Sequence, residues 1–156
     1  MLAQVLALAA FLAAPAAAEP LPPGLTAGER VVVQEAIDGD TLRLADGREL
    51  RLAAVAAPKP QLPRTGAITA PDARLDALAE AARQAIDAWT RGRPVDLYFP
   101  AQRSDRHGRI VAHAMTPDKG WLQTALLAQG LARVQTTATM AAAADALLRT
   151  EAAARA

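Results

Sequence analysis

The side chains that could carry chemistry in this 156-residue sequence are few, and most of them are charged. There are no cysteines, and the only histidines are His107 and His113. This composition excludes thiol catalysis, disulfides and cysteine-ligated metals, and two histidines are too few for a histidine-rich zinc site. Arginine, lysine and carboxylate side chains are left to perform any chemistry.

These charged residues are unevenly distributed, although the net charge is only +1. Residues 43–109 contain twelve Lys or Arg against eight Asp or Glu. Such a bias fits an anionic ligand, and an ordinary solvated surface would look the same. Asp38-Gly39-Asp40 has the composition of a turn, in which the aspartates accept backbone N–H bonds.

Apolar periodicity and turn residues predict the elements that must position these side chains. Strands are expected over residues 31–37, 41–44, 49–55, 95–99 and 109–115, and helices over 71–89, 121–129 and 138–154. Asp46-Gly47 predicts a tight hairpin turn, and residues 56–70 predict a long loop. The order predicts an OB-fold, a five-stranded Greek-key barrel with one helix inserted before strand four and two C-terminal helices.

The N-terminal residues have the composition of an export signal. Residues 1–18 carry no charged side chain and end in small residues, which favours a secretory signal peptide over a membrane anchor. Residues 19–30 are rich in Pro and Gly and predict an irregular leader. The folded domain is therefore expected over 31–156, in a secreted or periplasmic monomer with no membrane span once the signal is removed.

Three segments, in order, carry a resemblance to a known family. The first is 36–42 (AIDGDTL) with 50–52 (LRL), the second is 104–109 (SDRHGR) with 112–113, and the third is 121–134 (WLQ to LARV). Together they resemble the staphylococcal nuclease (thermonuclease) family. The resemblance implies an OB-fold and calcium-dependent cleavage of the phosphodiester backbone of DNA or RNA.

The resemblance also implies roles for individual residues. Arg51 and Arg109 match the two arginines that contact the phosphate during catalysis, and a guanidinium is well suited to this because it donates two parallel hydrogen bonds. Asp40 matches a calcium ligand, and Thr41 is expected to add its backbone carbonyl. His107 stands where the family usually has tyrosine and is a candidate phosphate donor, although its place in the turn favours an ordinary solvated residue.

Two positions depart from the family pattern that follows the third strand. Ala56 replaces the second calcium carboxylate, and Lys59 replaces the catalytic glutamate. One carboxylate and one carbonyl make a poor calcium site, and a protonated lysine cannot accept a proton. Lys59 would instead attract phosphate, so calcium is expected only at a degraded site.

Three functions remain open from the sequence. The first is a nuclease-like domain that binds the phosphates of nucleic acid or nucleotides, with phosphodiesterase activity lost or strongly reduced. The second is an active metal-dependent nuclease with a rearranged site. The third is a non-catalytic interaction domain of the cell envelope, in which Arg51 makes an ordinary salt bridge to Glu49 or Asp105.

Overall fold

The computed structural model describes residues 24–60 and 72–156. The predicted signal peptide, residues 19–23 of the predicted leader and residues 61–70 of the predicted loop lie outside the described residues. Among the described residues, no helix has both the length and the apolar character needed to cross a membrane.

The strands form a closed barrel, which confirms the predicted OB-fold. One sheet runs in the order β3-β2-β1-β5-β6-β7, and β3 also pairs with β6, which joins the two sides of the barrel. The strands are β1 (Thr26–Asp38), β2 (Thr41–Leu44), β3 (Glu49–Leu52), β5 (Pro94–Phe99), β6 (Ile110–Thr116) and the short β7 (Gly120–Trp121). The β3–β6 pairing is parallel, and the others are antiparallel.

Alternating leucines fill the barrel. Leu42, Leu44, Leu50 and Leu52 are at most 1% exposed, so one face of β2 and β3 points inward. Because side chains alternate along a strand, the residue between Leu50 and Leu52 points outward. That residue is Arg51, so the inward-facing Leu50 and Leu52 direct its side chain away from the barrel interior.

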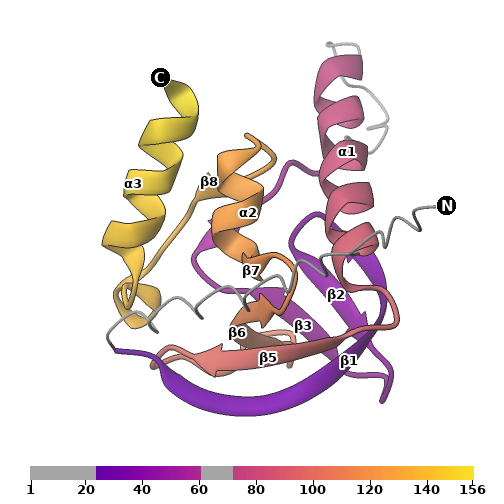
Figure 1. Cartoon of the computed structure of the whole chain (residues 1–156), viewed down its shortest axis with the longest axis vertical. Coiled ribbons are helices and arrows are strands. Elements are labelled where there is room, and N and C mark those ends of the chain that lie inside the picture. The colour runs from indigo at the N-terminus through magenta and orange to yellow at the C-terminus, as the bar shows by residue number, and fades with distance from the viewer. Residues whose placement is uncertain (1–23, 61–71) are drawn as a thin grey trace, which may run out of the picture.

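Three helices lie together on one side of the barrel (Figure 1). They are α1 (Ala73–Thr90), α2 (Leu122–Ala128) and α3 (Ala144–Arg155), with a 3-10 turn at Ala138–Met140. The later part of β1 reaches α1, where the Ala36 N–H donates to the Asp87 carboxylate at 2.7 Å. Helix α1 starts at Asp72, whose side chain accepts the backbone N–H of Arg74 as an N-cap. It buries Ala82 and Ile86, whereas Leu78 is 38% exposed.

Two strand predictions need correction. Strand β1 begins at Thr26, so residues 26–30 belong to the barrel and not to an irregular leader. The glycine at position 28 serves packing there, because a Cβ would lie 2.3 Å from the Phe99 ring. The third predicted strand, 49–55, stops at Leu52. A turn through Ala54, whose φ is +61°, separates it from β4 (Val55–Ala56), which pairs with β8 (Arg133–Val134).

The last helix was also predicted too long. Residues 138–154 are not one helix, because Ala143 adopts a left-handed φ of +68° between the 3-10 turn and α3. Helix α3 is fixed by Leu147, which is fully buried, and by the Glu151 carboxylate, which accepts the Val134 N–H at 3.0 Å. Helix α3 therefore packs against α2 and against β8, the strand that pairs with β4.

Candidate functional site

The turn between β1 and β2 brings two carboxylates together beside β4. The Asp38 carboxylate accepts the Asp40 N–H at 2.9 Å, as expected for an aspartate turn. Gly39 allows close approach, because a Cβ there would lie 2.6 Å from the Cβ atoms of both Ala57 and Ala82. The turn is therefore pressed against both the chain after β4 and helix α1.

Asp40 is fully buried, and its carboxylate is surrounded by donors. Oδ2 accepts the Ala57 N–H at 2.6 Å. Oδ1 lies 2.6 Å from Lys59 Nζ and 2.9 Å from Arg51 Nη1, and it also accepts the Thr41 hydroxyl at 3.2 Å. A buried carboxylate is tolerated only when it is paired and hydrogen-bonded in this way.

Lys59 bridges the two aspartates. Its ammonium lies 2.6 Å from Asp38 Oδ2 as well as 2.6 Å from Asp40 Oδ1. Burial raises the pKa of the Asp40 carboxyl above its ordinary value, while the Arg51 and Lys59 cations oppose that change. Burial acts the same way on Asp38, but hydrogen bonds from Lys59 and the Asp40 N–H bring the pKa of Asp38 below its ordinary value.

The residues at this cluster do not fit a calcium ion. Calcium takes six to eight oxygen ligands, whereas the oxygens of Asp38 and Asp40 that face the cluster already accept from a lysine, an arginine and a backbone N–H. Ala56 offers no carboxylate, and Thr41 contributes a hydroxyl donor to Asp40. Within residues 24–60 and 72–156 no group of three or more His, Cys, Asp or Glu could hold a metal.

Arg51 lies where β2, β3 and β6 meet. It faces Thr41 across one pairing and Val111 across the other, and its guanidinium donates to the carbonyl of Leu52 at 3.2 Å. The sequence suggested Glu49 or Asp105 as its salt-bridge partner, and this is wrong because Glu49 pairs with Arg43 and Asp105 pairs with Arg109. The partner of Arg51 is Asp40.

The second arginine is positioned by the turn before β6. Arg109 Nε lies 2.7 Å from Asp105 Oδ2, and the other oxygen of Asp105 accepts the N–H groups of His107 and Arg109. Burial opposes ionisation of Asp105, but Arg109 and these N–H groups lower its pKa below the ordinary value. Asp105 thus orients Arg109, a role that sequence reasoning missed although the residue lies within the quoted motif.

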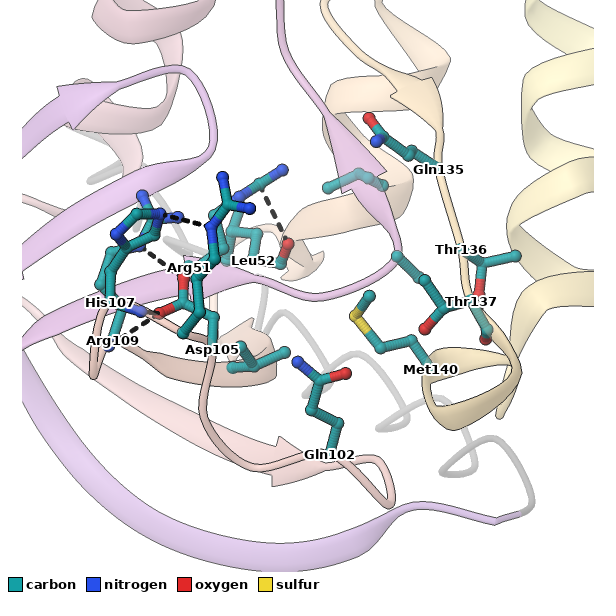
Figure 2. A pocket seen from close by; sticks show the side chains of 14 residues that line it. Arg51, Leu52, Gln102, Asp105, His107, Arg109, Gln135, Thr136, Thr137 and Met140 are labelled. Atoms are coloured by element: carbon teal, nitrogen blue, oxygen red, sulfur yellow. Dashed lines mark hydrogen bonds and ion pairs between the residues drawn. The ribbon is translucent and has the colours of Figure 1, made fainter.

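A cavity of about 510 Å³, here called the arginine cavity, brings both arginines together. Figure 2 shows Arg51, His107 and Arg109 at one end, and Gln102, Thr137 and Met140 at the other. Arg106 also lines it, so three arginines face one aspartate, Asp105. The Nε2 atom of His107 accepts from Arg106 Nε at 3.1 Å, so the imidazole is held at the edge of this cationic group.

A second cavity of about 550 Å³, here called the lysine cavity, adjoins the first. Asp40, Lys59, Arg133, Leu75 and Leu78 contribute to its lining. Arg51 and Gln135 line both cavities, so Arg51 stands between them. The predicted site residues Asp40, Arg51, Lys59, His107 and Arg109 are therefore distributed over two adjoining cavities.

Two buried polar residues behind the site have structural roles. Gln123 donates to the carbonyls of Ala53 and Ala112 and accepts the Ala114 N–H, which fastens the turn after β3 to β6. His113 accepts the Trp121 indole N–H at Nδ1, while its Nε2 has no partner among the described residues. Burial lowers the pKa of His113 to about 4.

Comparison with known proteins agrees with the fold. Residues 49–156 match the family model described as staphylococcal nuclease homologue, and this is more than half of the chain. The match includes Arg51, Lys59 and Arg109, whereas Asp38 and Asp40 precede it. No curated protein matches the chain. A closed barrel of this topology together with this match shows that the chain belongs to the staphylococcal nuclease homologue family.

Proposed function

We propose that this domain binds phosphate groups of nucleic acids or nucleotides and that its phosphodiesterase activity is lost or strongly reduced. The observation that carries the proposal is the arginine cavity, where Arg51 and Arg109 face the same space while the two carboxylate positions of the family are Ala56 and Lys59. The family match supports a nuclease-type, nucleic-acid-binding function.

Phosphate binding follows from the charge and geometry of the arginine cavity. Arg51, Arg106 and Arg109 outnumber the single lining carboxylate, so the cavity attracts anions. A guanidinium fork matches the oxygens of a phosphate and remains charged at any physiological pH. Asp105 and Asp40 hold two of these forks in place, which reduces the conformational entropy that is lost when the ligand binds.

Loss of cleavage follows from the carboxylates. Hydrolysis of a phosphodiester needs a group that takes a proton from the attacking water, and such a base contributes about 10²–10⁴-fold in rate. Lys59 is an ammonium that donates to two aspartates and has no lone pair to offer. Asp40 is buried and its oxygens are occupied by donors, so it is not placed to act as a base.

Phosphate binding in this proposal does not need a metal. The Lys59 ammonium already supplies positive charge between Asp38 and Asp40, where the resemblance implies a calcium ligand. A divalent cation would have to displace this ammonium, and the cations around it would repel the metal. Chelators should therefore leave the affinity for phosphate unchanged.

The test is direct binding of a labelled single-stranded oligonucleotide in the presence of a chelator. The expected result is binding that is weakened at least tenfold by the double variant Arg51→Ala/Arg109→Ala. Arg43→Ala is the matched control, because Arg43 lies on β2 in a carboxylate pair and lines neither cavity. Binding that survives the double variant, or that falls equally in the control, would overturn the proposal.

One observation favours a second function, that of a non-catalytic interaction domain. Arg51, Lys59 and Arg109 each have a carboxylate partner, which is the pattern expected if they were ordinary salt bridges. The two functions separate in the same assay. An interaction domain would bind no oligonucleotide at low salt, whereas the phosphate-binding domain would bind and respond to salt.

The active-nuclease alternative and the export of the protein are tested separately. Turnover of the oligonucleotide with any divalent cation, abolished by Asp40→Ala, would establish the rearranged active nuclease. Export is proposed on the composition of residues 1–18 alone. An N-terminus beginning at Glu19 in protein recovered outside the cytoplasm is the expected result, and an intact Met1 would contradict it.

A further inference from the structure

The lysine cavity has a cation that the proposed phosphate site does not use. Arg133 on β8 is exposed and lines this cavity, and it has no ion-pair partner among the residues that the structure describes. The other cations in the lining, Arg51 and Lys59, are both paired with Asp40. Arg133 is therefore available to an anionic group that enters the cavity.

The alanine at position 56 explains why Arg133 is available. Ala56 and Arg133 are directly opposite in the antiparallel β4–β8 pairing. Residues opposite each other in such a pair project to the same face, with Cβ atoms about 5 Å apart. A carboxylate at position 56 would be in reach of Arg133, whereas the alanine leaves both the space and the guanidinium open.

The walls of the two cavities indicate what kind of ligand they accept. Leu75 and Leu78 of α1 give the lysine cavity an apolar wall beside its cations. No tryptophan, tyrosine or phenylalanine of the described residues lines either cavity. Base stacking on aromatic side chains, the usual means by which single strands are held, therefore has no platform here.

We infer that the lysine cavity is a second anion subsite, which takes the neighbouring phosphate of a nucleic-acid strand whose first phosphate lies in the arginine cavity. Arg51 lines both cavities and so stands between the two phosphates. Arg133 contacts the second phosphate, and Leu75 and Leu78 contact the sugar. The strand is recognised by its backbone and not by its bases. This inference rests on the proposed function.

The first test compares ligands that differ only in phosphates or in bases. Binding is measured for inorganic phosphate, a mononucleotide, a dinucleotide with two phosphates, and a dinucleotide backbone that lacks both bases. The expected result is a gain of at least tenfold between one phosphate and two, with the base-free backbone within about twofold of the normal dinucleotide. Equal affinity for one and two phosphates, or loss of affinity without the bases, would overturn the inference.

The second test removes Arg133. Arg133→Ala is expected to weaken the two-phosphate ligand about five- to tenfold and to leave inorganic phosphate unchanged. The dependence of log affinity on log salt should fall by about 0.7 for a longer single strand, the value for one lost phosphate contact. Arg149→Ala is the matched control, because Arg149 is also exposed, has no ion-pair partner among the described residues and lines neither cavity.

The two tests separate failure of this inference from failure of the proposed function. If Arg51→Ala/Arg109→Ala abolishes binding of every ligand but Arg133→Ala changes nothing, the phosphate site stands and the second subsite is wrong. If Arg51→Ala/Arg109→Ala changes nothing, the proposed function fails first. A loss with Arg149→Ala equal to that with Arg133→Ala would show only general attraction to a basic surface and would also overturn the subsite.

Discussion

The carboxylates of the two charged turns differ in burial and in the way they bind their cations. In the turn between β1 and β2, Asp40 is fully buried and forms ion pairs with both Lys59 and Arg51. In the turn before β6, Asp105 holds Arg109 by one edge, and the arginine still faces a cavity. The first turn has become an internal ion cluster, whereas the second still presents a cation to a ligand. Under the proposed function, the first turn is closed to a metal and the second leaves Arg109 open to phosphate.

The largest expected effect is the loss of the buried carboxylate. Asp40→Ala leaves Lys59 and Arg51 without their shared partner and the Ala57 N–H without an acceptor. Removing one partner of a buried ion pair costs about 3–5 kcal/mol. Asp105→Ala should cost less, on the order of 1 kcal/mol, because Asp105 and Arg109 are only partly buried and solvent screens their pair in part. Denaturant unfolding of both variants measures the two values, and equal losses would contradict the contrast between the turns.

The buried imidazole of His113 is expected to lower the unfolding free energy at a higher pH than the carboxylates of either turn. The folded-state pKa of His113 is about 4, below the ordinary value of 6.5. The unfolded chain therefore binds a proton in this range while the folded chain does not, and stability falls as the pH drops from about 6.5 to 4, by about 3 kcal/mol in total.

The variant that tests this is His113→Asn, which keeps an acceptor for the Trp121 indole but does not titrate. Its unfolding free energy should be nearly flat between pH 6.5 and 4, where the parent declines. A parent curve that is already flat over this window would show that His113 does not control acid sensitivity, and the two turns would then have to account for any loss at lower pH.

Calcium should raise the stability of a variant that lacks the Lys59 ammonium, but not the stability of the parent. Lys59→Ala removes the ammonium that bridges Asp38 and Asp40 and exposes two carboxylates to solvent ions. Calcium at about tenfold its dissociation constant would stabilise this variant by about 1.4 kcal/mol. Thermal unfolding with and without calcium is the measurement. The parent should show no shift, and a calcium-induced shift of the parent would mean that the cluster admits metal after all.

The smallest effect concerns the order in which the two turns titrate. Burial raises the pKa of Asp40, whereas the N–H groups and Arg109 around Asp105 lower its pKa in spite of burial. On lowering the pH, Asp40 should therefore take up its proton before Asp105 does. Carboxyl-carbon chemical shifts followed by NMR would show this order. The reverse order would mean that Arg51 and Lys59 outweigh the burial of Asp40.

Much of the barrel could be predicted because its signals are local. The Asp46-Gly47 turn and the alternating leucines determine β2 and β3, and the predicted helix ends at residues 89 and 129 lie within one residue of the observed ends, Thr90 and Ala128. Besides the early start of β1 at Thr26, the failures occurred where an alanine adopts a left-handed backbone conformation. Ala54 and Ala143 both adopt positive φ, and neither has the glycine or proline that would have marked a break.

Motif spacing selected the candidate site residues, but it did not give their ion-pair partners. Motif spacing identified Arg51, Lys59 and Arg109, and all three line the cavities. The Lys59–Asp38–Asp40 cluster joins residues about twenty positions apart, and its geometry depends on the turn at Ala54 and on the fit of Gly39 against α1. The sequence assigned no role to Arg133, although it lies in the third motif segment, because its position opposite Ala56 depends on the β4–β8 pairing.

The central claim is that Lys59 and Ala56 have replaced the catalytic half of the site while the phosphate-binding half is retained. The most direct measurement is cleavage of labelled single-stranded DNA and RNA, with calcium and with chelator, by the parent and by the double variant Ala56→Asp/Lys59→Glu. We predict that the parent binds but does not cut under either condition and that the variant cuts with calcium. Calcium-dependent cleavage by the parent, abolished by Asp40→Ala, would contradict the account.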